Sequence, residues 1–231
     1  MKDRRSFYRN NQTLRFDRGE TILYQDMAPK HLYGIKNGVV ESYNITCCGE
    51  SQTIAFTTVG GIFPKCWGIS KTERTLFYYR AHTDCELYII SKHDFQRELV
   101  GDVDFSTKVI NQMASSLVAS RLHLDALGKC KASVRLLYTF RFLALIYGKN
   151  IGKNLVKIQI PLTQQSIANL AGLTRETTSM ELNKIKDRGI ASCKRMYYTI
   201  DTKKLNDSIS DEYNPGICAD LVTNVVSDRE G

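Results

Sequence analysis

The hydrophobic pattern of this chain changes at Gly101, and the change limits the folds that are open to it. Before Gly101, short runs of β-branched and aromatic residues are separated by turn residues, which is typical of an antiparallel sandwich or barrel. The runs cover residues 21–24, 32–36, 39–45, 53–56, 77–80 and 86–90. After Gly101 the apolar residues follow helical spacing. The chain has 231 residues and domains commonly hold roughly 100–150, so the sequence predicts an α+β protein of two domains.

Glycine-containing turns separate the expected strands. Asn37-Gly38 supplies the positive φ angles of a tight hairpin turn, so we expect the strands on either side of it to pair. Residues 48–50 and 60–61 are further expected turns.

One long amphipathic helix is expected over residues 102–128. Its apolar residues fall on the two seam positions of a single heptad register, with Ser106 and Ser120 in the remaining seam positions. Such a helix either packs on its own domain or pairs with its copy in a second chain, and we take the dimer seam as the hypothesis. Gly128 ends the helix. The seam residues are Val103, Ile110, Met113, Leu117, Leu124 and Leu127.

Residues 163–185 carry the most specific motif in the chain. Thr163 has the residue type of a helix N-cap, and small residues follow it on an inner face. Gly172 permits a sharp turn, Thr174 caps a second helix and Gly189 ends that helix. Two helices joined by a short glycine-containing turn form a helix-turn-helix, whose second helix enters the major groove of DNA. The alternative is an ordinary helical hairpin.

The distribution of charge separates these two interpretations. Residues 130–205 hold 14 basic and 4 acidic side chains, a net +10, whereas residues 1–129 are at net +3 and residues 206–231 at net −5. A basic segment of this kind favours a polyanionic partner, and nucleic acid is the usual one. An anionic membrane surface prefers a basic amphipathic helix with bulky apolar anchors, so double-stranded DNA is the expected partner.

The opening of the second helix and the segment after it suggest roles at DNA. Arg175 can donate two hydrogen bonds to guanine, and Glu176 can accept one from cytosine N4. The alternative for Glu176 is stabilisation of the helix dipole. Residues 190–200 alternate as a hairpin with Lys194 and Arg195 at its tip, which predicts either a wing on the DNA backbone or a solvated charged turn. The residues expected at DNA are Thr163, Gln164, Gln165, Thr174, Arg175, Glu176, Thr178, Ser179, Met180, Lys184, Lys194 and Arg195.

A β-rich domain, a long helix and a winged helix-turn-helix follow one another in this chain. Two segments carry a family resemblance, LTQQSIANLAGLTRETTS at 162–179 and HLYGIKNGVVESY at 31–43. Over roughly residues 14–205, the chain resembles the CRP/FNR family of bacterial transcription regulators. The resemblance implies an N-terminal antiparallel β-roll like a cyclic-nucleotide-binding jelly roll, a long dimerisation helix and a C-terminal winged helix-turn-helix. It further implies a homodimer on a near-palindromic operator, with Glu176 and Ser179 facing the bases, and RNA polymerase as a partner.

Several positions depart from that family. Cyclic-nucleotide-binding members carry a Gly-Glu pair and an Arg-Ser or Arg-Thr pair, whereas Pro64-Lys65 and Thr75-Leu76 stand near those positions here. We therefore expect that the chain does not bind cyclic AMP, and its effector stays unidentified. Met180 stands where many relatives place an arginine at the operator, which shifts the expected readout towards a thymine methyl.

The cysteines offer no metal or cofactor site by their spacing. No cysteine precedes Cys47, so the clustered N-terminal cysteines of the oxygen-sensing branch are missing, and no zinc or iron–sulfur spacing occurs. We expect no metal and no cofactor. The alternative is a haem or metal gathered by Cys66, Cys85, His82 and His93. The chain has seven cysteines and no visible export signal, which predicts reduced thiols in the cytoplasm. No apolar run approaches the ~20 residues of a membrane span, so no span is expected.

The expected domains are a β-roll sensor at 1–101, a dimerisation helix at 102–128, a DNA-binding domain at 129–205 and an acidic tail of low order at 206–231. The leading hypothesis is a sequence-specific transcription regulator. The alternative is a ligand-sensing or scaffold protein whose C-terminal domain does not read DNA sequence. An enzyme is not expected, because the four histidines lack a partnership with a nucleophile and no phosphate-cradling glycine loop occurs.

Overall fold

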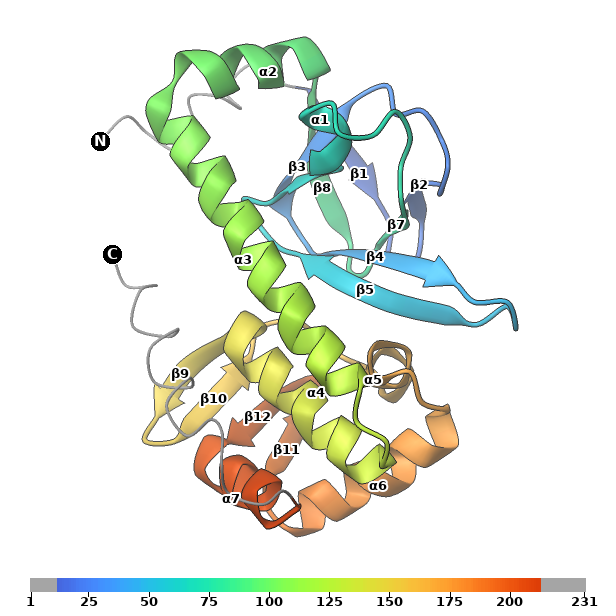
Figure 1. The fold of residues 1–231 in the computed structure, drawn as a ribbon, viewed down its shortest axis with the longest axis vertical. Coiled ribbons are helices and arrows are strands. Elements are labelled where there is room, and N and C mark those ends of the chain that lie inside the picture. The colour runs from blue at the N-terminus through green and yellow to red at the C-terminus, as the bar shows by residue number, and fades with distance from the viewer. Residues whose placement is uncertain (1–11, 213–231) are drawn as a thin grey trace. The chain divides into compact units, whose positions relative to one another are not determined.

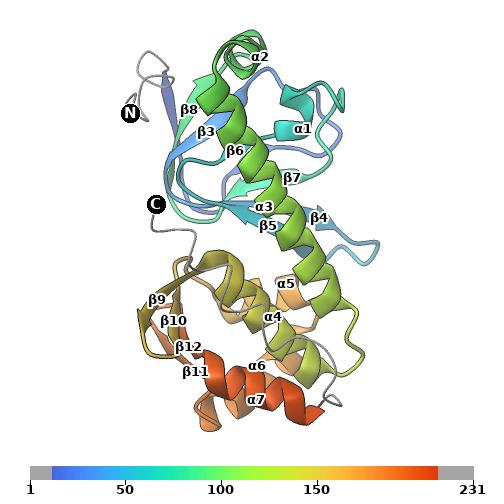
Figure 2. The same cartoon turned by 60° about the vertical axis from the view of Figure 1, so that its left-hand side comes forward.

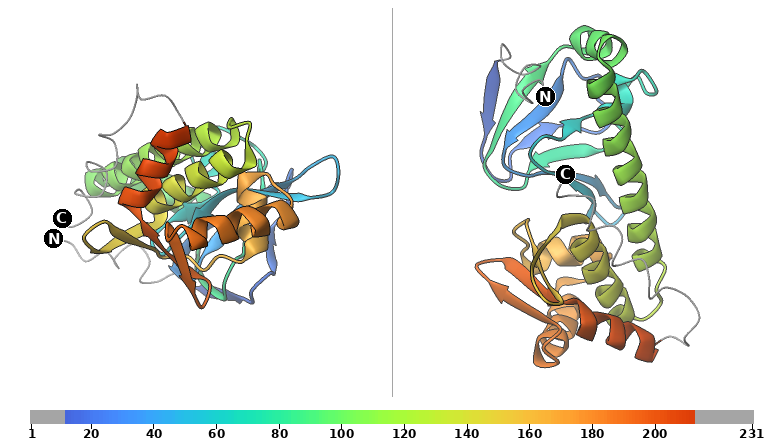
Figure 3. Two further views of the ribbon diagram at one scale, coloured as in Figure 1. Left: turned by 90° about the horizontal axis from the view of Figure 1, so that it is seen from below. Right: turned by 90° about the vertical axis from the view of Figure 1, so that its left-hand side faces the viewer.

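The computed structural model describes residues 12–212 (Figure 1). Its contacts divide the chain into two compact units, with the division between Ser116 and Leu117. This division falls within helix α3 (Val103–Leu127), which is drawn as one continuous helix in Figure 3.

The N-terminal unit contains two four-stranded antiparallel sheets, with strand orders β1-β8-β3-β6 and β2-β7-β4-β5. This confirms the predicted antiparallel β-roll. Its strands are β1 (Thr13–Phe16), β2 (Thr21–Leu23), β3 (Leu32–Asn37), β4 (Val40–Ile45), β5 (Ser51–Thr57), β6 (Ile62–Phe63), β7 (Tyr78–Ala81) and β8 (Cys85–Ile90), and its short helices are α1 (Lys65–Gly68) and α2 (Lys92–Gly101).

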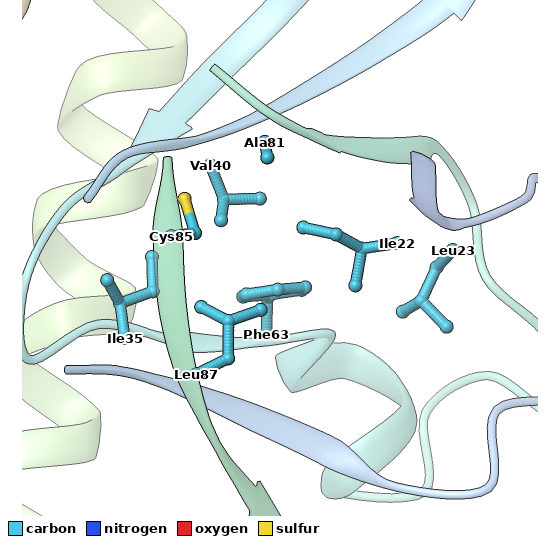
Figure 4. Packing of buried hydrophobic residues seen from close by; sticks show 8 residues of the cluster. All are labelled: Ile22, Leu23, Ile35, Val40, Phe63, Ala81, Cys85 and Leu87. Atoms are coloured by element: carbon cyan, nitrogen blue, oxygen red, sulfur yellow. The ribbon is translucent and has the colours of Figure 1, made fainter. Parts of the chain in front are cut away.

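Buried side chains of the strands fill the space between the two sheets. Figure 4 shows the eight side chains of this cluster converging from both sheets. Phe63 stacks on Tyr33 of its own sheet, with ring centroids 5.5 Å apart, and on Tyr79 of the other sheet, with ring centroids 5.0 Å apart, so the second pair joins the sheets. The interior between the sheets therefore combines aliphatic side chains with a stack of aromatic rings. The cluster consists of Ile22, Leu23, Ile35, Val40, Phe63, Ala81, Cys85 and Leu87.

The prediction that Asn37-Gly38 closes a hairpin is wrong. Strand β3 pairs with β6 and β8, whereas β4 pairs with β5 and β7, so the dipeptide carries the chain from one sheet to the other. Gly38 has a φ of +92°, and a Cβ there would lie 2.3 Å from the Asp84 carbonyl oxygen. The glycine is needed for a close approach of two backbone segments rather than for a hairpin. The turns at 48–50 and 60–61 are confirmed, with Gly49 and Gly60 at positive φ.

The C-terminal unit contains a four-stranded sheet of order β11-β12-β10-β9 and helix α4, on which the three later helices α5, α6 and α7 pack. Helix α4 buries nine side chains, including Leu136, Phe140 and Leu143. The elements after α3 are α4 (Ala132–Tyr147), β9 (Gly148–Gly152), β10 (Leu155–Ile158), α5 (Gln164–Ala171), α6 (Arg175–Asp187), β11 (Ala191–Lys194), β12 (Tyr197–Asp201) and α7 (Thr202–Glu212).

Residues 206–231 were expected to form an acidic tail of low structural order. This expectation is wrong for residues 206–212, which are helical. Helix α7 continues to Glu212 and packs on α4 (Figure 3). Leu205 and Ile209 are buried one helical turn apart, which gives α7 the apolar face that the acidic composition concealed. Residues 213–231 lie outside the described part of the chain.

None of the helices in residues 12–212 combines the length and apolar character that a membrane span requires.

A charged group is buried on the β2-β7-β4-β5 sheet. The Glu41 carboxylate accepts hydrogen bonds from Thr53 Oγ1 at 2.5 Å and from Arg80 Nε at 2.7 Å, and His82 Nδ1 lies 3.7 Å from it. Burial raises the pKa of Glu41, but the hydrogen bonds from His82, Arg80 and Thr53, together with the Arg80 charge, outweigh burial and lower the pKa to about 2. The carboxylate is therefore ionised in the folded chain at neutral pH and stabilises it.

We expect Glu41→Gln to lower the free energy of unfolding at pH 7 by about 3 kcal/mol, because it leaves Arg80 without its buried partner. The folded-state pKa lies below the usual 4.5, so the stabilisation is present above pH 4.5 and is lost as pH falls from about 4.5 to about 2. Urea unfolding, followed by the fluorescence of Trp67, the single tryptophan, measures the free energy of unfolding of the N-terminal unit.

The matched control is Glu50→Gln, which neutralises an exposed carboxylate on the same hairpin. Equal losses for the two variants, or a Glu41→Gln effect that does not shrink in acid, would contradict this assignment.

Candidate nucleic-acid interface

Helix α5 begins and ends at the residues that the sequence indicates. Thr163 is its N-cap, and its hydroxyl accepts a hydrogen bond from the Ser166 N–H at 3.0 Å. Gly172 ends the helix in the left-handed region, with φ +59° and ψ +45°, and donates its N–H to the Ala168 carbonyl. Ile167 and Ala171 are fully buried. The helix is thus short and close-packed, and the glycine turns the chain sharply into α6. Figure 2 labels both helices in the C-terminal unit.

Two side chains from earlier helices hold this turn. Arg135 donates from Nε to the Lys129 carbonyl at 2.9 Å and from Nη1 to the Gly172 carbonyl at 3.2 Å. His123 Nε2 lies 2.7 Å from the Leu170 carbonyl oxygen, which accepts its hydrogen bond, and its ring stacks on Phe142. Sequence reasoning missed both residues, because Arg135 lies 37 positions before Gly172 and His123 lies 47 positions before Leu170.

Helix α6 presents one polar face outward. Its N-cap is Thr174, whose hydroxyl accepts the Thr177 N–H at 3.2 Å. Leu182 and Ile185 are buried, whereas Arg175 and Glu176 are exposed at the first turn. Met180 is 59% exposed on the same outer side and Ser179 is half-buried. The first turns of α6 therefore offer a cation, an anion and an apolar group to a ligand, with the N–H groups of the helix terminus beside them.

Glu181 and Lys184 form an ion pair on α6. Lys184 Nζ lies 2.7 Å from Glu181 Oε1, and the Glu181 side chain is the more buried of the two. This pair explains why a polar residue stands at a half-buried position of the helix. Lys184 remains exposed and available to an anion.

The structure removes Thr178 from the residues expected at DNA. Its side chain is fully buried beneath α6, so it cannot reach a base or a phosphate. Within residues 12–212, its Oγ1 has no hydrogen-bond partner. The sequence prediction failed here because a threonine next to exposed polar residues looks polar, although the helical period places it inward.

The remaining expected DNA contacts lie on the surface of the same unit. Gln165 is exposed and its amide nitrogen donates to Asn169 Oδ1 at 2.7 Å, while Gln164 is half-buried. Strands β11 and β12 form the predicted hairpin, and Arg195 and Met196 make its two-residue turn with φ angles of +50° and +67°. The Met196 carbonyl accepts the Leu162 N–H at 2.8 Å, which ties the hairpin to the segment before α5. Lys194 and Arg195 are exposed at the tip.

The expected dimer residues lie along α3 and are largely exposed. Val103 is 80% exposed, Ile110 62%, Leu117 55% and Leu124 67%. Met113 is exposed and Leu127 is half-buried. Val109, His123 and Ala126 on the same helix are buried. An apolar row on one side of α3 thus stays in solvent in the single chain.

The cassette positions that differ from cyclic-nucleotide binders have other partners. Thr75 Oγ1 donates to the Tyr24 carbonyl at 2.5 Å and accepts the Met27 N–H at 3.1 Å. Arg74 Nη1 donates to the Asp26 carbonyl at 2.7 Å. Burial lowers the pKa of Lys65. Thr75 and Arg74 therefore hold the neighbouring loop.

The alternative metal site is not assembled. Cys85 is buried and hydrogen-bonded to the Val39 and Thr83 carbonyls, whereas Cys66 is exposed. His93 is exposed beside Asp94. Across residues 12–212, no three His, Cys, Asp or Glu side chains are grouped so that they could hold a metal ion.

Comparison with known proteins places two families on the two units. Residues 13–102 match the cyclic nucleotide-binding domain, and residues 135–208 match the Crp-like helix-turn-helix domain. The nitrogen fixation regulation protein FixK of Rhizobium meliloti (strain 1021) is 25% identical over 186 residues, covering 80% of each chain. Electron transport regulator A of Shewanella oneidensis is 27% identical over 193 residues, covering 82% of this chain and 75% of the relative.

Solved structures share the fold. FixK2 from Bradyrhizobium japonicum superposes with a TM-score of 0.70 at 21% identity, covering 85% of this chain and 96% of that chain. A CooA mutant from Carboxydothermus hydrogenoformans has a TM-score of 0.72 at 21% identity, covering 88% and 89%.

The buried hydroxyl of Thr178 predicts a stabilising substitution. We expect Thr178→Val to raise the free energy of unfolding by about 1 kcal/mol, because valine keeps the shape and removes an unsatisfied polar group. Denaturant unfolding of the whole chain, followed by far-ultraviolet circular dichroism, measures the change.

The neighbouring Thr177→Val is the matched control. The Thr177 hydroxyl accepts a hydrogen bond from Thr174 at 3.0 Å, so this variant should lose about 0.5–1 kcal/mol. If Thr178→Val destabilises the chain as much as the control does, the Thr178 hydroxyl has a hydrogen-bond partner in solution.

Proposed function

The chain belongs to the CRP/FNR family and is a DNA-binding transcription regulator of that type, and from this premise we propose that two copies bind a near-palindromic operator with α6 in the major groove. The observation that carries the proposal is the exposed first turn of α6, where Arg175 and Glu176 project from a capped helix whose inner face is buried. The matching relatives are named as regulators, and we propose a regulatory rather than a catalytic role in the cytoplasm.

Arg175 and Glu176 are proposed to read base edges. The guanidinium can donate two parallel hydrogen bonds to guanine O6 and N7, whereas the carboxylate can only accept, and cytosine N4 is its natural donor. A carboxylate facing DNA is repelled by phosphates, so Glu176 is favourable there only when it reaches a base donor or orients Arg175. Ser179 lies one turn further along the helix, and its hydroxyl can accept or donate a hydrogen bond.

Met180 is proposed to change the readout at one base pair. Its side chain is 59% exposed on the outer side of α6 and has no charge to offer to guanine. An apolar group in the major groove contacts the thymine methyl, so a T·A pair is expected opposite Met180.

Backbone contacts are proposed to position the unit on the duplex. Lys194 and Arg195 at the tip of the β11–β12 hairpin, Gln165 at the start of α5 and Lys184 on α6 are exposed polar or basic groups suited to phosphates. Thr163, Gln164 and Thr174 lie at the helix N-termini, whose N–H groups favour phosphate oxygens. These contacts set orientation and salt dependence without reading sequence.

The effector is proposed to be something other than cyclic AMP. The family's ribose and phosphate contacts are replaced by Pro64-Lys65 and Thr75-Leu76, and the Thr75 hydroxyl already bonds to the Tyr24 and Met27 backbone. RNA polymerase is proposed as the partner at the promoter.

We expect Arg175→Ala and Glu176→Ala each to cost about 1–3 kcal/mol of binding to the selected operator and to relax preference at one base pair. Selection from a random-sequence DNA pool with the parent gives the operator, and fluorescence anisotropy at several salt concentrations gives the affinities. Parent binding should weaken steeply with salt, because phosphate contacts release counterions.

Matched controls are Lys203→Ala on α7 and Asp187→Ala at the far end of α6, both exposed and outside the proposed contacts. If the selected pool from Arg175→Ala and Glu176→Ala equals the parent's pool, α6 does not read bases in this way.

The apolar row on α3 predicts a dimer that charge disrupts. We expect Ile110→Glu and Leu117→Glu each to convert the dimer to monomer at micromolar concentration, because they place a carboxylate in the apolar seam. Analytical ultracentrifugation measures the mass, and Trp67 fluorescence checks the fold of the N-terminal unit.

Val118→Glu provides the comparison, since Val118 is an exposed apolar residue of the same helix outside the seam. It should leave the dimer intact. A parent that sediments as a monomer, or equal effects at 117 and 118, would rule out this seam.

A further inference from the structure

Cys47 and Cys48 lie next to each other at the tip of the β4–β5 hairpin, and both are exposed. Their sulfur atoms are 3.9 Å apart. We propose that these two thiols form a bidentate site for a thiophilic divalent cation of the zinc and cadmium class. The site is separate from the helix-turn-helix and from the cyclic-nucleotide cassette positions.

The hairpin turn holds the backbone of both cysteines. Strands β4 and β5 pair up to Ile45 and Ser51 and run out together to a common tip (Figure 1). The Thr46 N–H donates to the Glu50 carbonyl at 2.8 Å and the Gly49 N–H donates to the Thr46 carbonyl at 2.9 Å. The Glu50 N–H also donates to Thr46 Oγ1 at 3.2 Å. The two thiols are therefore carried on a closed turn, with their sulfur atoms 3.9 Å apart.

The sulfur–sulfur distance fits a bent chelate. A tetrahedral ion with metal–sulfur bonds of about 2.3 Å holds two sulfurs about 3.8 Å apart, whereas a linear arrangement with the same bonds needs about 4.6 Å. The distance of 3.9 Å agrees with the tetrahedral value. Three- or four-coordinate ions are thus favoured over linear ones.

A disulfide between the two cysteines is disfavoured by their adjacency. They are joined by a trans peptide, which sets their Cα atoms about 3.8 Å apart. Disulfides usually need Cα atoms at least about 4.4 Å apart. The pair therefore persists as two thiols under reducing conditions, and thiolates are the ligands that soft cations prefer.

The charge of the hairpin favours a cation. Residues 40–57 contain two glutamates and no lysine or arginine, although the whole chain carries a net +8. Glu41 is buried with Arg80, so Glu50 is the exposed charge next to the pair. No third His, Cys, Asp or Glu from the described part of the chain completes a group with them. Water or a small-molecule thiol fills the remaining positions on the ion.

Binding is a proton-releasing ligand exchange. Two metal–sulfur bonds form, two S–H bonds break, and the two protons pass to the solvent without any change of oxidation state. Affinity therefore rises with pH, and proton release reports how many thiols take part.

The test uses the full reduced chain with cadmium chloride and zinc chloride as probes. Ultraviolet absorbance follows the cadmium–thiolate charge-transfer band, and zinc affinity is measured by competition with a chromophoric chelator. We expect one ion per chain. Cys47→Ser and Cys48→Ser should each weaken binding by about 100-fold, because the second thiolate binds in an intramolecular step, and should release one proton fewer.

Cys66→Ser and Cys130→Ser are the matched controls, because each removes an exposed cysteine outside the hairpin. Both should keep the affinity of the parent, and Trp67 fluorescence reports the fold of the N-terminal unit in every variant. The proposal is overturned if Cys47→Ser and Cys48→Ser bind zinc and cadmium as tightly as the parent does. It is also overturned if only a control variant loses binding. DNA binding plays no part in these readouts, so their failure leaves the proposed operator binding untouched.

Discussion

The turn at Gly172 determines how α6 faces its surroundings. A left-handed residue is needed there, because the chain must end α5 and begin α6 within three residues while both helices bury their inner faces. The Gly172 carbonyl is bonded to Arg135, and the Leu170 carbonyl is bonded to His123. Each of these bonds satisfies a carbonyl that the end of α5 leaves without an intrahelical partner. The outward direction of Arg175 and Glu176 follows from that arrangement, and so does the inward direction of Thr178.

The N-terminal unit has the fold of the cyclic nucleotide-binding domain, held by its own set of buried contacts. Stacked aromatic rings of Tyr33, Phe63 and Tyr79 pack the interior between its sheets. Strand β4 carries a buried carboxylate, Glu41, whose hydrogen bonds outweigh the cost of burial. The fold by itself does not identify the signal, since the function of a site depends on its side chains rather than on its fold.

Local patterns predicted the elements that depend on neighbouring residues. The caps Thr163 and Thr174 and the helix-ending Gly172 act over three or four positions, and all three occur as expected. Asn37-Gly38 has equally strong local chemistry, but its interpretation as a hairpin was wrong because β3 pairs with residues about fifty to sixty positions further along the chain. Helix α7 was missed because its net negative charge is visible in composition, whereas the burial of Leu205 and Ile209 depends on α4.

The sequence by itself determined the order of a β-roll, a long helix and a winged helix-turn-helix, and it placed Arg175, Glu176 and Met180 at the start of the second helix. Hydrophobic period and capping residues are short-range, so they can be read without coordinates. Only the tertiary structure decided that Thr178 is buried, that Arg135 and His123 hold the turn, and that the sulfurs of Cys47 and Cys48 lie 3.9 Å apart. These facts depend on distances between atoms that chain connectivity leaves open and that packing and turn geometry set.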